Sequence, residues 1–205
     1  MFLSLDGIDG VGKSTQCGLL CEWLRAGGRE VVTCRDPGST PLGEAVRRLL
    51  LDARGGPISR RAEMLLYMAA RAQLVEEVIA PALAAGKTVV SDRYLLANVV
   101  YQGHAGGLDV ETLWSIGRVA TGGVTPDLTL LLDMPPQAAV GRLNRELDRM
   151  ERQTTEFRER LRQGFLAEAA RSAGKIVVID AARPIEDVQA DIRAAVTRVY
   201  SGAAT

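Results

Sequence analysis

The sequence has little of what metal-thiolate or imidazole chemistry requires. It contains one histidine, His104, and three cysteines, Cys17, Cys21 and Cys34. No zinc-ligand spacing is present, and no residues suggest a Ser-His or Cys-His nucleophile system. Cys17 and Cys21 lie four positions apart, and we expect them to form a buried thiol pair on one helix face. The residues that carry the chemistry of this protein are therefore expected among types other than histidine and cysteine.

Long apolar runs and an excess of one charge sign are also missing. The formal net charge is +0 at pH 7, so no overall field favours nucleic acid or a membrane. No apolar run approaches 18 residues, and the N-terminus has no signal pattern. We therefore expect a cytoplasmic enzyme, with residues 1–205 forming one domain that binds neither nucleic acid nor a membrane. Lysine is scarce, and the abundant arginines supply planar donors suited to phosphate.

The most informative stretch is the glycine-rich segment 7–14, which reads G-x-x-x-x-G-K-S. An apolar run at 2–5, which we predict to be a buried strand, precedes it, and a run with helical spacing at 15–24 follows. This is the P-loop pattern, in which backbone N–H groups and a helix N-terminus hold phosphate oxygens. We expect Lys13 to reach the β- and γ-phosphates and Ser14 to ligate Mg²⁺. The residues predicted to bind ATP here are Gly7, Ile8, Asp9, Gly10, Val11, Gly12, Lys13, Ser14 and Thr15.

The rest of the chain alternates between predicted strands and helices. Apolar runs predict strands at 30–34, 88–91, 128–132 and 176–179, and helical spacing occurs at 42–51, 62–84, 110–120, 137–150, 155–170 and 184–199. This alternation predicts an α/β fold with a five-stranded parallel sheet flanked by helices on both faces. Ligands of such sheets collect at the carboxyl ends of the strands. Polar residues follow every predicted strand, and we expect one site to collect Asp6, the segment 35–40, Asp92, Asp133 and the segment 180–183.

The arginines indicate an enzyme that moves phosphate between two anionic substrates, rather than a GTPase switch. They occur in three separate places: Arg35 with Arg47, Arg71 with Arg93, and Arg142 with Arg145 and Arg149. Such an enzyme works mainly by positioning its substrates and neutralising their charge.

Three of these patterns have a second interpretation that involves no chemistry. Asp92 and Arg93 would hold a Mg²⁺-bound water and an acceptor phosphate, or they would form a structural ion pair. Tyr67 and Arg71 share a helix face, where they would contact a base, or Tyr67 would pack in the core and Arg71 would be solvated. Residues 142–162, with seven arginines and five acids, form either a mobile lid or a solvated helix face.

Taken together, the motifs resemble those of bacterial-type thymidylate kinases over about residues 2–200. The matching segments are 7–10, 35–40 (R-D-P-G-S-T, similar to R-E-P-G-G-T), 69–75, 92–94 (D-R-Y), 97–103 and 126–133. The resemblance implies a P-loop NTPase fold with an arginine-rich helical lid at approximately 141–155. It also implies a homodimer that transfers the γ-phosphoryl group of MgATP to dTMP, giving dTDP and ADP. The alternatives are another deoxynucleotide or deoxynucleoside kinase and a catalytically inactive nucleotide-binding regulator.

The resemblance further implies roles for single positions. Tyr67 would stack on thymine, Arg71 would bond its O4, and Tyr101 would disfavour a ribose 2′-hydroxyl. Val11 is not basic, so lid arginines would supply the charge over ATP, and Arg183 would lie against adenine. The resemblance implies that catalysis involves Lys13, Asp9, Asp92, Arg93, Arg145 and Arg149, and that Ser14 and Asp92 hold Mg²⁺. It implies that Arg142 and Arg183 bind ATP beside the P-loop. The residues implied to bind dTMP are Asp9, Pro37, Arg47, Tyr67, Arg71, Arg93, Asn98, Tyr101 and Gln102.

Two departures from the family pattern concern the segment after the second predicted strand. Ser39 stands where the family has a second glycine, which restricts φ and would shift that loop. Asp36 replaces a glutamate and shortens the reach of the carboxylate by one methylene. Neither change removes a group that phosphoryl transfer needs.

Overall fold

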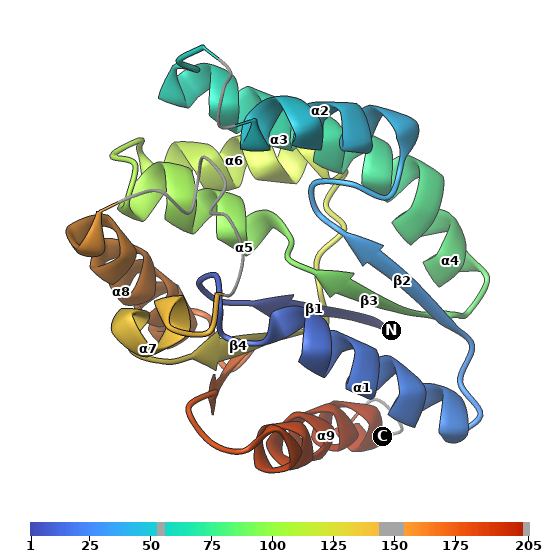
Figure 1. Ribbon diagram of the computed structural model, residues 1–205. Helices are drawn as coiled ribbons and strands as arrows, with labels where there is room; N and C mark the ends of the chain where they lie inside the picture. The colour runs from blue at the N-terminus through green and yellow to red at the C-terminus, as the bar shows by residue number, and fades with distance from the viewer. Residues whose placement is uncertain (53–55, 144–153, 203–205) are drawn as a thin grey trace.

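The computed structural model of the chain describes residues 1–52, 56–143 and 154–202, and it contains the predicted sheet (Figure 1). Five strands pair in parallel in the order β2-β3-β1-β4-β5. Their bounds are β1 (Phe2–Asp6), β2 (Val31–Arg35), β3 (Thr88–Asp92), β4 (Leu128–Asp133) and β5 (Ile176–Asp180). The predicted strands and the predicted α/β architecture are therefore confirmed.

Helices cover both faces of this sheet. On one face α1 (Lys13–Ala26) packs against α9 (Ile185–Gly202), and on the other α8 (Thr155–Arg171) packs against β4 and β5. A further layer contains α2 (Pro41–Leu51), α3 (Arg60–Leu74) and α6 (Val110–Ala120), in which α2 and α6 both contact α3. Within the described ranges, no helix combines the length and the apolar character needed to cross a membrane.

The central strands have no solvated face, which explains why they read as continuous apolar runs. Every residue of β1 is buried, including Leu3 and Leu5, and β4 is buried up to Asp133. Because helices cover both faces, alternating polar positions would cost the free energy of burying unpaired polar groups. Each fully buried leucine contributes roughly 1.5–3 kcal/mol relative to an exposed one. The buried core of the sheet therefore leaves the ends of the strands as the place where charged residues collect.

The predicted helix at 62–84 consists of three consecutive segments rather than one regular helix. They are α3, the π-helix η1 (Val75–Ile79) and α4 (Ala80–Ala84). Pro81 lies in the first turn of α4. Proline has no N–H and its ring clashes with the carbonyl four residues earlier, so the wider π turn before it accommodates this break.

A second helical segment was not predicted at all. Directly after β3 the chain forms α5 (Leu95–Asn98) and the π-helix η2 (Val99–His104). Residues 95–103 are all buried, so the segment has no polar stripe and its sequence shows no amphipathic period. Burial on every side concealed the helix that carries three of the predicted site residues.

The predicted helix at 137–150 begins as α7 (Pro136–Val140). Residues 144–153 lie outside the described part of the chain, and with them Arg145, Arg149 and most of the expected lid.

Candidate active site

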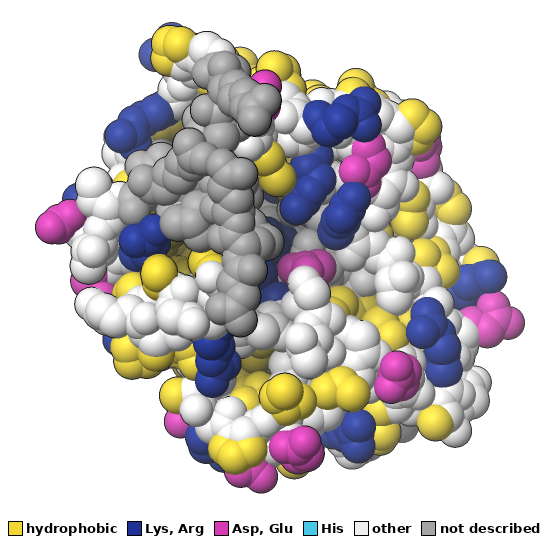
Figure 2. All heavy atoms as spheres, in the orientation of Figure 1, with side chains coloured by type: hydrophobic (Ala, Val, Ile, Leu, Met, Phe, Trp, Pro, Cys, Tyr) yellow, Lys and Arg dark blue, Asp and Glu magenta, His cyan; other side chains and the backbone are white. Residues whose placement is uncertain are grey.

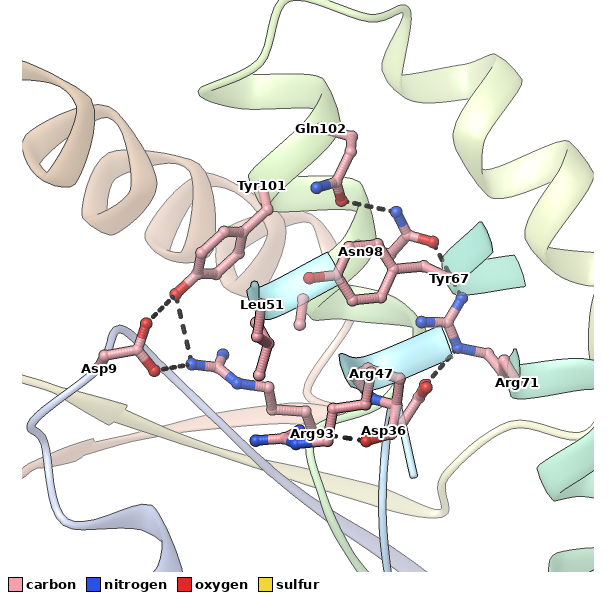
Figure 3. Close-up of a pocket in the computed structure, with 12 residues that line it drawn as sticks. Asp9, Asp36, Arg47, Leu51, Tyr67, Arg71, Arg93, Asn98, Tyr101 and Gln102 are labelled. Atoms are coloured by element: carbon pink, nitrogen blue, oxygen red, sulfur yellow. Dashed lines mark hydrogen bonds and ion pairs between the residues drawn. The ribbon is translucent and has the colours of Figure 1, made fainter. Parts of the chain in front are cut away.

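Two cavities open at the carboxyl edge of the sheet and meet there. The P-loop cavity is about 710 Å³ in volume and is lined by residues 9–16, with Arg142 and Arg183 among its other walls. The second, here named the Tyr67 cavity, is lined by Asp9, Asp36, Pro37, Arg47, Leu51, Tyr67, Arg71, Arg93, Ala97, Asn98, Tyr101 and Gln102 (Figure 3). Four charged residues line both cavities: Asp9, Asp36, Arg47 and Arg93. On this face of the molecule, Lys and Arg side chains gather beside the central hollow (Figure 2).

The glycines of the P-loop are required by its geometry. Gly7, Gly10 and Gly12 have φ values of 137°, 89° and 91°. A Cβ atom on Gly7 would lie 2.4 Å from the carbonyl oxygen of Leu132, and one on Gly10 would lie 2.1 Å from that of Ala139. At Gly12 the same position meets no atom within 4 Å. The loop therefore packs tightly against its own fold, with the close backbone approach and conformational freedom that phosphate binding uses.

Lys13 lies inside this loop and is buried. Its Nζ donates hydrogen bonds to the carbonyl oxygens of Gly7 at 3.2 Å and Ile8 at 2.7 Å. Burial, reinforced by the positive charge of Arg93, lowers the pKa of Lys13 to about 8. The side chain is thus held against the loop carbonyls inside the P-loop, and its contact with the β- and γ-phosphates stays a prediction.

Ser14 and Asp92 come together from α1 and β3. The Ser14 hydroxyl donates to Oδ2 of Asp92 at 2.8 Å. A hydroxyl oxygen and a carboxylate oxygen are hard ligands suited to Mg²⁺, so the predicted metal residues fit that ion. Asp92 bonds Ser14, whereas the Arg93 guanidinium bonds the Gly7 carbonyl. The alternative interpretation, in which Asp92 and Arg93 form an ion pair with each other, is therefore not supported.

Arg93 occupies the wall between the two cavities. Its guanidinium donates to the Gly7 carbonyl at 2.9 Å, to the Asp9 carboxylate and to the Tyr101 hydroxyl at 3.3 Å. Its backbone is held at φ 70°, a left-handed conformation that is uncommon for a residue with a side chain and that clusters at functional sites. Figure 3 shows Arg93, Asp9 and Tyr101 pointing toward one another.

The electrostatics of this triad follow from burial and close charges. Burial raises the pKa of Asp9, but the charges of Arg93 and Lys13 outweigh it and hold that pKa well below its usual range. Burial likewise raises the pKa of the Tyr101 hydroxyl well above 10. Tyr101 is therefore a neutral donor and Asp9 a permanent acceptor at neutral pH.

Arg71 is the buried cation of the Tyr67 cavity. Only 1% of its surface is exposed, so the alternative in which it is solvated is wrong. Its Nε donates to Asp36 at 2.5 Å and one terminal nitrogen donates to Oδ1 of Asn98 at 3.0 Å. Burial raises the pKa of Asp36, although the charge of Arg71 acts against this shift. Tyr67 lines the same cavity from one turn earlier on α3.

The loop after β2 tolerates the two departures from the family pattern. Ser39 adopts φ 62°, its Oγ accepts from the Arg35 backbone at 3.0 Å, and its N–H donates to Glu44 at 2.8 Å. These bonds hold the serine in the conformation that a glycine would adopt freely. Asp36, despite its shorter side chain, still reaches Arg71.

Most of the other predicted residues reach one of the two cavities. Arg47 donates to the Pro37 carbonyl at 3.1 Å, and Arg142 donates to the Ala181 carbonyl at 3.1 Å. Arg183 lines the P-loop cavity while it pairs with Asp191. Thr15 and Val11 line the P-loop cavity, and Asn98, Tyr101 and Gln102 line the Tyr67 cavity.

Three carboxylates expected at the site, those of Asp6, Asp133 and Asp180, are not among the described residues that line the cavities. Asp133 accepts two hydrogen bonds from Arg162 of α8, at 2.8 and 2.9 Å. Asp180 is the last residue of the edge strand β5, and its carboxylate lies 3.8 Å from the Arg183 guanidinium at the protein surface. The expectation that one site collects the polar residue after every strand was therefore wrong for Asp6 of β1, for Asp133 of β4 and for Asp180 of β5. Arg162, the last residue of the arginine-rich segment 142–162, therefore forms an ion pair with the carboxylate that ends β4.

Sequence reasoning gave no chemical role to two buried acids near the cavities, although it expected the first of them, Asp6, at the site. Asp6, at the end of β1, is fully buried, and neither carboxylate oxygen has a hydrogen-bond partner among the described residues. Its pKa is raised to about 7, mainly by burial. Glu63 accepts a hydrogen bond from Gln102 at 2.7 Å. Its spacing of four from Tyr67 and eight from Arg71 was a signal that it shares their face of α3.

Comparisons with known proteins agree with this geometry. The model of the thymidylate kinase family matches residues 5–192, a range that contains the described lining of both cavities. A thymidylate kinase of Rhodopirellula baltica is 50% identical over 192 residues, which cover 94% of this chain and 78% of that protein. Another, of Chromohalobacter salexigens, is 48% identical over 200 residues and covers 96% and 94%. The crystal structure of thymidylate kinase from Ehrlichia chaffeensis matches with a TM-score of 0.80, 28% identity and coverage of 96% and 98%.

Proposed function

Because this chain belongs to the thymidylate kinase family, we propose that it transfers the γ-phosphoryl group of ATP to the 5′-phosphate of dTMP, giving ADP and dTDP. The observation that carries this proposal is the wall of four charged residues shared by the P-loop cavity and the Tyr67 cavity. A donor in the first and an acceptor in the second would place their phosphates on either side of Arg93. Phosphoryl transfer needs such alignment and charge neutralisation more than covalent chemistry.

On the donor side, the P-loop amides and Lys13 bind the phosphates of ATP. Lys13 exchanges its bonds to the loop carbonyls for bonds to phosphate oxygens, which are stronger acceptors because they are charged. Ser14 and Asp92 would hold Mg²⁺, which would supply positive charge to neutralise the phosphates. Arg142 and Arg183 bind ATP from the far wall of the cavity.

On the acceptor side, Arg47 and Arg93 hold the monophosphate. A monophosphate oxygen is largely ionised at neutral pH, so the attack needs no general base. Asp9, held ionised by Arg93 and Lys13, contacts the sugar 3′-hydroxyl, and Tyr101 restricts the space beside the 2′ carbon. Tyr67 stacks on thymine and Arg71 donates to its O4. Asn98, Gln102 and Pro37 complete the acceptor pocket.

Closure over the donor completes the catalytic machinery in this proposal. Arg145 and Arg149 lie outside the described residues, and we assign them to the lid at approximately 141–155 on the family pattern alone. They supply the positive charge that Val11 does not bring to the P-loop. Excluding water at the same time strengthens each charge interaction and protects ATP from hydrolysis.

A homodimer in the cytoplasm, with each 205-residue chain as one domain, is also part of the proposal. Large apolar side chains are exposed on α2, α3 and α6: Leu42 at 45%, Leu49 at 54%, Leu65 at 50% and Val119 at 83%. These three helices pack together, because α2 and α6 both contact α3, and an exposed apolar patch is typical of an interaction site. Light scattering after gel filtration tests this: the double variant Leu49→Glu, Val119→Glu should elute as a monomer, whereas a wild-type monomer contradicts the assignment.

A coupled assay of ADP release across nucleoside monophosphates tests the activity itself. We expect rapid turnover with dTMP and almost none with thymidine, because the acceptor must already carry a phosphate. Preference for dUMP or a deoxynucleoside would favour a different nucleotide kinase. ADP release that does not depend on dTMP would favour a nucleotide-binding regulator.

A further inference from the structure

Five buried side chains in and beside the Tyr67 cavity form one continuous line of hydrogen bonds. Gln102 donates from Nε2 to Glu63 at 2.7 Å, and Asn98 donates from Nδ2 to Oε1 of Gln102 at 2.6 Å. Arg71 donates to Oδ1 of Asn98 at 3.0 Å and to Asp36 at 2.5 Å. Figure 3 shows the part from Gln102 to Asp36, and both amides belong to residues that line the cavity. All five side chains are at most 7% exposed.

The ends of this line fix the direction of both amides. A guanidinium has only donors, and an ionised carboxylate has only acceptors. Arg71 therefore requires the oxygen of Asn98 to face it, which turns the Asn98 nitrogen toward Gln102. The Gln102 oxygen then faces Asn98, and its nitrogen is left needing an acceptor. Glu63 is that acceptor, at the N-terminal turn of α3, where an acidic side chain is also favoured by the helix dipole.

We propose that Glu63 is a positioning residue, which holds the Gln102 and Asn98 amides in one orientation and thereby selects 4-oxo over 4-amino pyrimidines. This inference rests on the proposed function, because it concerns how that site recognises its acceptor base. Glu63 does not line the Tyr67 cavity itself, so it acts on the base only through Gln102.

The chemistry of the base explains why direction matters. Thymine presents an acceptor at O4 and a donor at N3, whereas cytosine presents a donor at position 4 and an acceptor at N3. In the observed orientation, Arg71 offers donors and the Gln102 and Asn98 oxygens offer remaining lone pairs. That pattern complements thymine and opposes cytosine. A site that leaves buried polar groups unpaired with the wrong ligand rejects it strongly.

Two substitutions of Glu63 distinguish the effect of its acceptor oxygen from the effect of its negative charge. Glu63→Met removes the acceptor at similar volume, so the Gln102 nitrogen loses its partner and the amide is held in direction from the Asn98 side alone. Glu63→Gln keeps an acceptor oxygen in the same place, so it should restore the orientation without the charge. Glu77→Met is the matched control, because Glu77 also accepts from a glutamine amide, that of Gln73, but at an exposed position of η1.

The experiment compares kcat/KM and the dissociation constants for dTMP and dCMP in each variant. For E63M we expect the dTMP-to-dCMP ratio to fall about tenfold, the size of one lost hydrogen bond. The loss should come from a higher KM for dTMP, with the KM for ATP unchanged. E63Q and E77M should keep the wild-type ratio.

An unchanged ratio in folded E63M overturns the inference, and so does a ratio that falls equally in E63Q. Thermal melting establishes that each variant is folded. Should E63M not fold, E63D replaces it, because it withdraws the acceptor by one methylene and should lower the same ratio. Wild-type protein that binds dTMP no better than dCMP contradicts the inference, whereas wild-type protein that binds dTMP but does not phosphorylate it contradicts the proposed function.

Discussion

The hydroxyl of Tyr101 donates a hydrogen bond to Oδ2 of Asp9 over 2.9 Å. The two residues lie 92 positions apart, one in the P-loop and the other in the π-helix η2. Arg93, at the end of β3, donates to both. The bond therefore ties the P-loop to the helix that lines the Tyr67 cavity.

Removing the Tyr101 ring and removing only its hydroxyl should have different effects. Tyr101→Ala opens space beside the 2′ carbon, so the preference for dTMP over its ribose counterpart should narrow at least severalfold. Tyr101→Phe keeps the ring and should keep that preference, while unfolding free energy falls by about 1 kcal/mol for the lost bond to Asp9. The ratio of kcat/KM for the two nucleotides measures the first effect and urea unfolding the second. An unchanged ratio in Y101A would remove the ring from this role.

Truncating Arg71 should weaken acceptor binding and spare ATP. Arg71→Ala removes the guanidinium that we propose to bond the base, so KM for dTMP should rise at least tenfold while KM for ATP stays within about twofold. It also leaves Asp36 buried without its cation, so melting must confirm that the variant is folded. Arg198→Ala, an exposed arginine on α9, is the control and should change neither constant. Loss of ATP affinity with intact dTMP affinity would reverse the assigned roles.

The Ser14–Asp92 pair should govern the metal requirement. Asp92→Asn keeps the shape of the side chain but removes the negative charge beside Ser14. We expect the Mg²⁺ concentration for half-maximal activity to rise and kcat to fall about a hundredfold, because charge neutralisation in the transition state is weakened. dTMP binding, measured by calorimetry without ATP, should be preserved. A wild-type Mg²⁺ response in this variant would show that Asp92 has no part in holding the ion.

Asp6 should make the protein less stable as the pH rises. Its pKa is raised from 3.8 to about 7 in the folded state, so the folded protein binds more protons between these values. Stability from this group is present below pH 4 and is lost as the pH rises through 7, by roughly 4 kcal/mol at 1.36 kcal/mol per pKa unit. Asp6→Asn cannot ionise and should lack this loss.

Urea unfolding of wild type and D6N between pH 4 and pH 8 measures the effect. The difference in unfolding free energy between the two proteins should shift in favour of D6N as the pH increases. Glu186→Gln, at an exposed acid in the first turn of α9, should run parallel to the wild type. Parallel curves for D6N as well would mean that Asp6 titrates in the folded protein as it does in the unfolded chain.

Spacing along the chain was enough for features that depend on local geometry. The order of glycines, Lys13 and Ser14 predicted the P-loop, because a strand, a tight turn and a helix N-terminus are specified by neighbouring residues. The apolar runs predicted all five strands, since strands buried on both faces need continuous apolar sequence. The prediction that Cys17 and Cys21 are buried was likewise confirmed, and the third thiol, that of Cys34, is buried as well.

Tertiary structure alone decided which polar residues meet. Asp133 and Asp92 both end strands, yet Asp133 bonds Arg162 of α8 while Asp92 bonds Ser14 of the P-loop, because each carboxylate takes the partner that packing brings closest. The helix at 95–104 was concealed because burial on all sides erases the amphipathic period. The line from Glu63 to Asp36 joins three separate segments, and no sequence spacing encodes hydrogen bonds between side chains so far apart in the chain.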